Sequence, residues 1–315
     1  MTIEEEIFMN KEDLNDIVNY YEKREKYEKT IYGKLTHEQR LKIHCLLLKI
    51  ICLKNKLSGF NITKIKDDSE ITERPKIFCI THIGKYDIEV ISEVIKEHYY
   101  LLSGDFENIY GTIEEKFLGF NGVVYVREDD KKDRKLSKEK MINILKNNGN
   151  IMYFPEGTWN LSPNLPVVKC SYGIIDVAMK SNAIIVPIAI EQYGKNFISA
   201  IGKNFDVNNY SENDKELAIE DLRSAMATLK WEIWENVSPN IRSEISEKDF
   251  DNFIGSRLKE WPNFTLEEFL DRVYKPKNIV EEKEVYEFLT KINLNYDNAF
   301  LAKSKHEYEK KYIKR

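Results

Sequence analysis

Between residues 75 and 201, short apolar runs alternate with stretches of helical character, and this alternation constrains the fold more than any other feature of the chain. The runs are rich in Ile, Val and aromatic residues and read KIFCIT, NGVVYVRE, GNIMYFPEG and NAIIVPIAIEQ. The helix-like stretches cover residues 88–99, 136–147 and 172–181. Strands that alternate with helices and are buried on both faces are typical of parallel sheets. We therefore predict an α/β fold with a mixed, largely parallel central sheet flanked by helices.

The flanking regions predict a division into three parts. Residues 1–66 are charged and helical in pattern, so we expect an N-terminal segment of amphipathic helices that is a candidate for membrane-surface binding. Residues 67–210 then form the α/β core. Strand patterns cease beyond Asn208, so residues 211–315 are expected to be a C-terminal helical extension packed on or near the core.

Composition excludes several classes of protein. The formal net charge of -5 is modest and gives no sign of nucleic-acid binding. The four cysteines form no CxxC pair, and His/Cys zinc spacing is absent, so no metal site is predicted. No apolar run approaches the roughly 20 residues that span a bilayer, and the acidic N-terminus is unlike a signal peptide. We expect a cytoplasmic protein, soluble or peripheral.

The segment Arg40 to Leu57, RLKIHCLLLKIICLKNKL, predicts a helix with an unusual surface. Lys42, Lys49 and Lys56 recur every seven residues, and no acidic residue lies between Arg40 and Lys56. A broad apolar face edged by lysine suits a helix that lies on an anionic membrane. The alternative is a helix that packs on the core with a solvated lysine edge, and from this segment alone that alternative is the more common case.

The first apolar run ends in a histidine. His82 follows this run, and Asp87 comes five residues later, with Gly84 between them. In a regular helix, residues five apart point about 140° apart. We therefore expect His82 to lie in a turn that Gly84 permits, with Asp87 in the first turn of the following helix. Asp87 would then fix the imidazole tautomer and leave the other ring nitrogen as a base, although a surface histidine is the usual alternative for such a pair.

The other three runs also end in, or contain, distinctive residues. Arg127 ends the second run, where it is suited to clamp a phosphate or to pair with a neighbouring carboxylate. Glu156, Gly157 and Thr158 follow the third run in a turn whose amides can bind an anion. Pro187 interrupts the fourth run. Polar residues beyond the carboxyl ends of strands line the ligand crevice of an α/β sheet.

In this order, the four segments resemble the motifs of the glycerolipid acyltransferase family, which includes lysophosphatidic acid and glycerol-3-phosphate acyltransferases. The H-x-x-x-x-D motif runs from His82 to Asp87, and the aliphatic strand ending in Arg from Gly122 to Arg127. The F-P-E-G-T-R motif runs from Phe154 to Trp159, and V-P-I from Val186 to Ile188. The resemblance covers about residues 75–200. It departs from the family at one position, because Trp159 stands where the family usually has Arg.

The resemblance implies an O-acyltransferase of the 1-acylglycerol-3-phosphate type, active in phospholipid synthesis or remodelling. Acyl-CoA or acyl carrier protein would donate the acyl group as a co-substrate, with no permanently bound cofactor. A lysophospholipid or glycerol-phosphate-type hydroxyl would accept it. His82 would act as the base and Asp87 as its orienting partner, with amides near Gly157 or Gly84 stabilising the oxyanion.

The resemblance also implies a set of substrate-binding residues, which are Arg127, Glu156, Gly157, Thr158, Trp159 and Lys169. The motif Arg helps to hold the acceptor phosphate in the family, so its replacement leaves the acceptor open. Trp159 is expected to line an apolar or sugar-like subsite or to stack on Arg127. The resemblance further favours membrane-surface binding by residues 40–57, at the inner face of the membrane.

Three other functions fit the same residues. A thioesterase or lipid hydrolase would use water in place of the acceptor. A non-catalytic lipid-binding protein would have a degenerate site, which the intact His82, Asp87 and Glu156 argue against. A cysteine enzyme would use Cys170 with His82, although Cys170 belongs to none of the four motifs.

Overall fold

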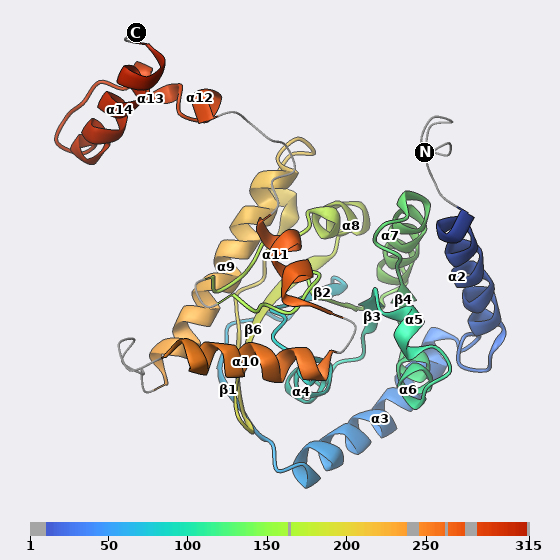
Figure 1. The fold of residues 1–315 in the computed structure, drawn as a ribbon. Helices are drawn as coiled ribbons and strands as arrows, with labels where there is room; N and C mark the ends of the chain where they lie inside the picture. Colours follow the sequence, from blue (N-terminus) through green and yellow to red (C-terminus); the bar gives the residue numbers. More distant parts are fainter. Residues whose placement is uncertain (1–10, 163–164, 238–245, 262–263, 275–281, 314–315) are drawn as a thin grey trace. The chain divides into compact units, whose positions relative to one another are not determined.

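The computed structural model describes residues 11–162, 165–237, 246–261, 264–274 and 282–313 (Figure 1). The chain divides into two compact units, Met1–Leu266 and Glu267–Arg315. The first unit holds the sheet and all the residues singled out above, and the second is a small helical unit.

A seven-stranded sheet forms the centre of the first unit. Its strands are β1 (Asn61–Asp67), β2 (Lys76–Ile80), β3 (Tyr100–Ser103), β4 (Val123–Tyr125), β5 (Ile151–Tyr153), β6 (Ile184–Tyr193) and β7 (Asn196–Ile201). The spatial order is β1-β7-β6-β2-β5-β3-β4. Neighbouring strands are parallel except for β6 and β7, which form an antiparallel pair. The predicted fold class, a mixed and largely parallel sheet flanked by helices, is confirmed.

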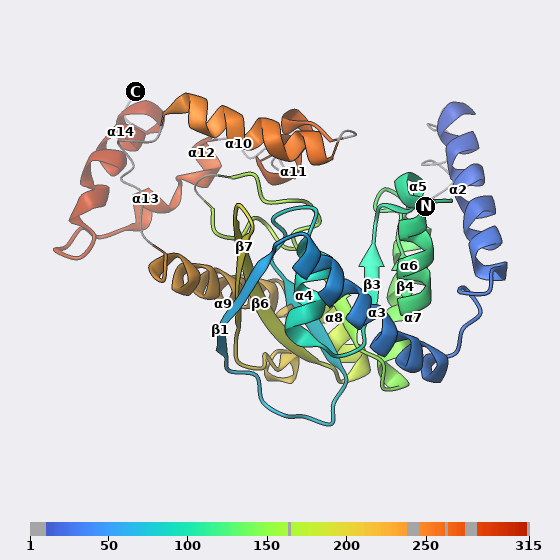
Figure 2. The ribbon, with the colours of Figure 1, turned by 90° about the horizontal axis from the view of Figure 1, so that it is seen from below.

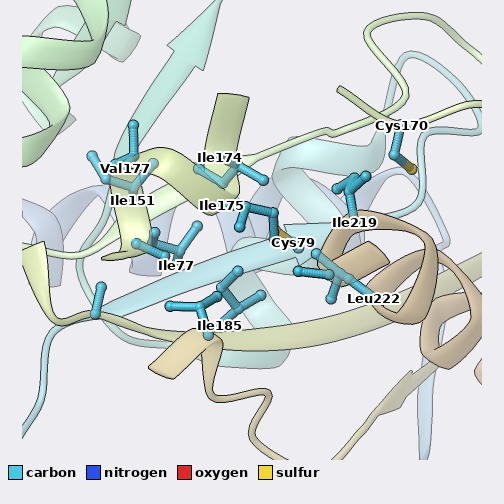
Figure 3. Packing of buried hydrophobic residues seen from close by; sticks show 14 of the residues in the cluster. Ile77, Cys79, Ile151, Cys170, Ile174, Ile175, Val177, Ile185, Ile219 and Leu222 are labelled. Carbon is cyan, nitrogen blue, oxygen red and sulfur yellow. The ribbon is translucent and has the colours of Figure 1, made fainter. Parts of the chain in front are cut away.

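Helices cover both faces of this sheet. Alternation along β2 sends Ile77 and Cys79 to one face and Phe78 and Ile80 to the other. The first face packs on α7 (Lys131–Lys146), α8 (Gly173–Ser181) and α9 (Lys215–Glu235). Figure 3 shows side chains of β2, β5 and β6 on this face beside those of α8 and α9. The second face packs on α4 (Asp87–Ile95).

The remaining helices surround this core. In the first unit they are α2 (Lys11–Lys29), α3 (His37–Leu57), α5 (Phe106–Ile109), α6 (Ile113–Asn121), a 3-10 turn (Val207–Asn209) and α10 (Glu247–Glu260). From the boundary onward they are α11 (Leu266–Tyr274), α12 (Glu282–Val285), α13 (Phe288–Lys291), a 3-10 turn (Ala299–Leu301) and α14 (Ala302–Tyr312). Within the second unit, the Tyr308 hydroxyl on α14 donates to the Lys283 carbonyl on α12 at 2.7 Å, so these helices are tied together.

The structure moves two of the expected boundaries. Strand β1 pairs with β7 from Asn61, so the sheet begins before the predicted boundary at residues 66 and 67. Lysines and polar residues dominate β1, which is half-exposed, and this composition hides its strand character. The C-terminal residues 211–315 do not form one part, because α9 packs on the sheet while Glu267–Arg315 form a separate unit.

The fourth apolar run is one continuous strand, so the predicted interruption at Pro187 is wrong. Pro187 pairs in register with Cys79, and its carbonyl accepts a hydrogen bond from the Gly202 amide at 2.9 Å. Its nitrogen therefore faces the side where β7 has already ended at Ile201. A missing N–H costs no ladder hydrogen bond there, which is why proline is tolerated in a central strand.

Candidate active site

His82 and Asp87 meet at the carboxyl end of β2, near the middle of the sheet. Asp87 is the first residue of α4, and His82 lies in the turn before it. The imidazole Nδ1 and Asp87 Oδ2 are 2.8 Å apart. This contact is the one that the five-residue spacing predicts when the histidine precedes the helix.

The Asp87 carboxylate is fixed by the backbone around it. It is buried, and Oδ2 also accepts hydrogen bonds from the amides of Ile83 at 2.7 Å and Gly84 at 3.0 Å. These amides belong to the turn before α4. The same carboxylate therefore stabilises this turn and orients the imidazole. Asp87 can therefore hold a proton on Nδ1 of His82, which leaves Nε2 as the basic nitrogen.

The backbone and ring of His82 are held by the turn that follows β5. The His82 amide donates to Glu156 Oε1 at 2.9 Å, and the His82 carbonyl accepts from the Asn160 amide at 2.7 Å. The imidazole stacks on Phe154 with ring centroids 4.3 Å apart. Nε2 makes no hydrogen bond with any described residue. The site therefore presents one rigidly oriented ring with one available nitrogen.

Glu156 is a positioning residue in this structure, although the family motif predicts a substrate-binding one. Its two carboxylate oxygens accept from the amides of His82 and Val168, at 2.9 and 2.8 Å. The side chain is buried, and burial raises the pKa of the Glu156 carboxyl from 4.5 to about 7, although the two amide donors oppose the shift. The carboxylate thus fastens the histidine loop to the segment after β5 and leaves no oxygen for a ligand.

The two amides expected to stabilise an oxyanion are already engaged. The Gly84 amide donates to Asp87, and the Gly157 amide donates to the Phe154 carbonyl at 3.1 Å. Gly157 adopts a φ of 65°, which explains the glycine in this turn. Gly84 has no positive φ, so its place in the motif has another cause. Thr158 is buried, and its hydroxyl makes no hydrogen bond with a described residue.

Trp159 lies beside the histidine. The Trp159 and His82 rings are arranged edge to face, with centroids 6.2 Å apart. The Trp159 and Trp261 ring centroids are 4.9 Å apart. The expected stacking on Arg127 is not what the structure shows, because the Arg127 guanidinium lies over the ring of Tyr20 at 5.7 Å. Trp159 therefore places an aromatic ring beside the histidine.

Arg127 follows β4 at the edge of the sheet. Its Nε pairs with Asp129 at 3.0 Å, while its Nη1 is buried and makes no hydrogen bond with a described residue. Strand β4 is three positions from β2 in the sheet, which separates the backbones of Arg127 and His82 by roughly 14 Å at the usual strand spacing. Arg127 is thus not part of the immediate surroundings of the imidazole.

Lys169 and Cys170 lie in the segment after the Glu156 turn. Lys169 is exposed between two buried neighbours, so its side chain points to solvent. Cys170 is buried, its thiol donates to the Val168 carbonyl, and burial raises the pKa of this thiol well above its usual value. A thiol held in this way is a poor nucleophile, which argues against the cysteine mechanism.

Helices outside the four motifs complete the surroundings of the histidine. Arg257, on α10, lies close to Gly84. Trp261, just after α10, contacts the ring of Trp159. Lys230 of α9 is buried, and its Nζ lies 2.5 Å from the Glu191 carboxylate. None of these residues belongs to a local motif, so sequence reasoning missed them. Among the described residues, no group of three or more His, Cys, Asp or Glu has the geometry to hold a metal ion.

Residues 61–191 match the family model described as Acyltransferase. These residues are similar to an acyltransferase domain. The match spans all four motifs, and it confirms the resemblance to glycerolipid acyltransferases predicted from them. Helices α2, α3, α9 and α10 lie outside it.

The fold of the acyltransferase domain is also found among solved structures. The crystal structure of the 1-acyl-sn-glycerophosphate (LPA) acyltransferase PlsC from Thermotoga maritima is similar, with a TM-score of 0.52 and 16% sequence identity. The similarity covers 66% of this chain and 87% of that one. A search of the curated proteins found no match.

Proposed function

We propose that this acyltransferase moves a fatty acyl group from an acyl thioester, of coenzyme A or acyl carrier protein, to a hydroxyl of a glycerolipid acceptor. The observation that carries the proposal is the His82–Asp87 pair in an acyltransferase domain. One imidazole nitrogen is bound to a buried carboxylate, and the other is available at the carboxyl ends of the strands. The cell would use this reaction in phospholipid synthesis or remodelling.

The proposed chemistry begins with the acceptor hydroxyl. Nε2 of His82 removes its proton as the oxygen attacks the thioester carbonyl carbon. Asp87, already bound to Nδ1, stabilises the imidazolium that forms. The tetrahedral intermediate then collapses, the carbon–sulfur bond breaks, and the thiolate takes the proton from Nε2. The products are an ester and a free thiol, and no covalent enzyme intermediate is needed.

An assay by mass spectrometry tests this proposal against hydrolysis on the same site. Purified protein is incubated with acyl-CoA, with and without a lysophospholipid. We expect the acylated lipid to form only in the presence of the acceptor, and His82→Ala to abolish it while circular dichroism shows an unchanged fold. Free fatty acid as the sole product would identify a thioesterase, and full activity of His82→Ala would refute the mechanism.

We also propose that α3 holds the enzyme on an anionic membrane surface. Four large apolar side chains form an exposed row along this helix, and they are Leu46 (61% exposed), Ile50 (48%), Leu53 (57%) and Leu57 (79%). Lys42, Lys49 and Lys56 lie exposed beside this row. Such a row edged by lysines matches an interfacial helix. Among the described residues, no helix combines the length and the apolar character needed to cross a bilayer.

The opposite face of α3 supports this orientation, because its polar residues are buried. Arg40 donates to backbone carbonyls of Gly119 and Tyr32, and His44 Nδ1 lies 2.8 Å from Asn121 Oδ1. Asn55 donates to Glu93 at 2.8 Å. These contacts hold this face, together with Leu47 and Ile51, against the core, so Leu46, Leu53 and Leu57 point outward. The core-packing alternative would have placed the leucine row inside.

A further inference from the structure

Helix α10 presents one face to the histidine loop. Ile254, Arg257 and Trp261 recur at helical spacing on this face, and Ile254 is buried. Figure 2 shows α10 on the side toward which the β3 arrow points, which is the carboxyl-end side of the parallel strands. The helix therefore supplies side chains to the edge of the sheet where His82 lies, although it follows the acyltransferase domain in sequence.

Arg257 lies against the H-x-x-x-x-D motif itself. A Cβ on Gly84 would come within 2.9 Å of its Nη1, so the guanidinium approaches the backbone of this loop closely. The same Nη1 donates to the neutral Gln192 Oε1 at 2.9 Å. The guanidinium thus reaches the loop two residues from the base.

The charge of Arg257 is only partly satisfied. The side chain is 11% exposed, and its carboxylate neighbour Glu260 lies at 3.6 Å, outside hydrogen-bond distance. Its Nε is buried and makes no hydrogen bond with a described residue. Its remaining contact is with the ring of Phe253, at 5.5 Å from the ring centroid. A largely buried guanidinium that has an ion pair with Glu260 and an unused Nε donor can still bind a further anionic group.

Trp261 connects the same helix to the aromatic ring beside the histidine. It contacts Trp159, which in turn meets the His82 ring, and it stacks on Phe264 at 4.2 Å. Aromatic rings and a guanidinium close to the same histidine suit a molecule with an apolar part and an anionic group. A lysophosphatidic acid has this form, since its phosphate is close to its free hydroxyl.

We propose that Arg257 binds the phosphate of the acceptor, and so does the work of the family arginine that Trp159 replaces. This assignment rests on the proposed acyl transfer and names its acceptor as a phosphate-bearing lipid. A guanidinium can make two parallel hydrogen bonds to a phosphate, and the pair is stronger where water is excluded. Arg257 is in this sense a specificity-determining residue.

Kinetics with two acceptors test the assignment, because the phosphate is the only group that differs. Rates are measured with 1-acyl lysophosphatidic acid and with a neutral monoacylglycerol, for the wild type, Arg257→Gln and Arg257→Lys. A lost charged hydrogen bond is worth about 1.5–3 kcal/mol, or roughly 10- to 150-fold. We expect Arg257→Gln to lower kcat/KM for lysophosphatidic acid by this factor, chiefly through KM, and to change kcat/KM for monoacylglycerol less than about threefold. Arg257→Lys should recover part of the loss.

The donor also carries phosphates, so the KM for acyl-CoA is measured in the same variants. A rise in the donor KM with an unchanged acceptor KM would assign Arg257 to the donor and overturn the proposal. Equal losses with both acceptors would overturn it too, since they would indicate a structural role. Lys259→Ala, an exposed charge on the same helix, is the matched control and should behave as the wild type.

A binding measurement separates this proposal from the proposed catalysis. In a His82→Ala background no turnover is required, and the fluorescence of Trp159 and Trp261 reports on the site. We expect lysophosphatidic acid to change the fluorescence of the His82→Ala protein at concentrations at least tenfold lower than those needed for the His82→Ala, Arg257→Gln double variant. Equal titration curves for the two proteins would overturn the role of Arg257. Failure of the acyl transfer itself would instead appear as a wild type that acylates neither acceptor.

Discussion

At the scale of single residues, the site depends on two carboxylates with different tasks. Asp87 contacts the imidazole and the amides of its own loop, whereas Glu156 joins that loop to the segment after β5. Both are buried, and the remaining oxygen of Asp87, Oδ1, is buried as well. The histidine is therefore the only one of the three that reaches the reacting atoms in the proposed mechanism.

The first prediction concerns the tautomer of His82. In Asp87→Asn the amide can donate to Nδ1, so the proton moves to Nε2 and the base is lost. We expect kcat to fall by roughly 10³- to 10⁴-fold with little change in KM. Steady-state kinetics measure this effect, and Asp251→Asn, an exposed aspartate on α10, is the control. A loss confined to KM would contradict the orienting role.

The second prediction concerns Glu156 and pH. Because burial raises its pKa from 4.5 to about 7, the folded protein binds this proton more tightly than the unfolded chain. Its contribution to stability is therefore fully present below about pH 4.5 and declines as the pH rises toward about 7, by at most roughly 3 kcal/mol. Urea unfolding across this window should show the wild type losing stability relative to Glu156→Gln as the pH rises. A difference that does not change with pH would show that the pKa is not raised.

At the scale of elements, α3 shows what a local pattern can and cannot establish. The helix begins with a reciprocal capping box between Thr36 and Gln39, which is a local sequence feature. The apolar content of the helix does not say which leucines face outward. That follows from Arg40, His44 and Asn55, whose partners lie on α6, on α4 and in the neighbouring loops.

The third prediction uses this orientation. Replacing Leu46 and Ile50 by Glu removes two exposed apolar side chains and adds two charges of the wrong sign, so we expect at least tenfold weaker binding to vesicles that contain anionic lipid. Vesicle flotation at low and high salt measures it, and high salt should also weaken wild-type binding. Leu217→Glu, at an equally exposed position on α9, is the control. Unchanged flotation of the double variant would refute the membrane-binding role of α3.

At the scale of the whole molecule, a buried ion pair ties the N-terminal helix to the sheet. Asp133 of α7 pairs with Arg24 of α2 and accepts from the Tyr20 hydroxyl at 3.0 Å. It also accepts from the Arg127 amide at 2.7 Å, directly after β4. Residues more than a hundred positions apart therefore meet at one carboxylate, which holds α2 against the end of the sheet.

The fourth prediction follows from this pair. Asp133→Ala leaves the buried Arg24 without a counter-charge, so we expect the free energy of unfolding to fall by about 3–5 kcal/mol. Adding Arg24→Met should recover part of the loss, because the buried charge is then absent. Glu28→Ala breaks an exposed pair with Lys140 between the same two helices and should cost less than about 1 kcal/mol. Equal losses in the two single variants, measured by urea unfolding, would contradict the buried pair.

The fold class, the order of the motifs and the contact between His82 and Asp87 could all be predicted from the amino-acid sequence. These are local properties: alternation of apolar residues, strand and helix signals, and a five-residue spacing that allows a carboxylate to reach back to an imidazole. The same reasoning did not predict the half-exposed strand β1, which forms because it pairs with β7. It also did not predict that β6 continues through Pro187, which is possible because β7 ends beside that residue.

The surroundings of the histidine, in contrast, depend on contacts between segments that are far apart in the chain. In the folded protein, the amides of Gly84 and Gly157 already donate hydrogen bonds within the protein. The Glu156 carboxylate accepts from the His82 amide, and the Trp159 ring contacts Trp261. Folding also brings Arg257 to Gly84 from more than 170 positions away in the chain. A local pattern carries no information about such contacts, because the burial of both surfaces, and not the spacing of residues, brings a distant helix onto the loop.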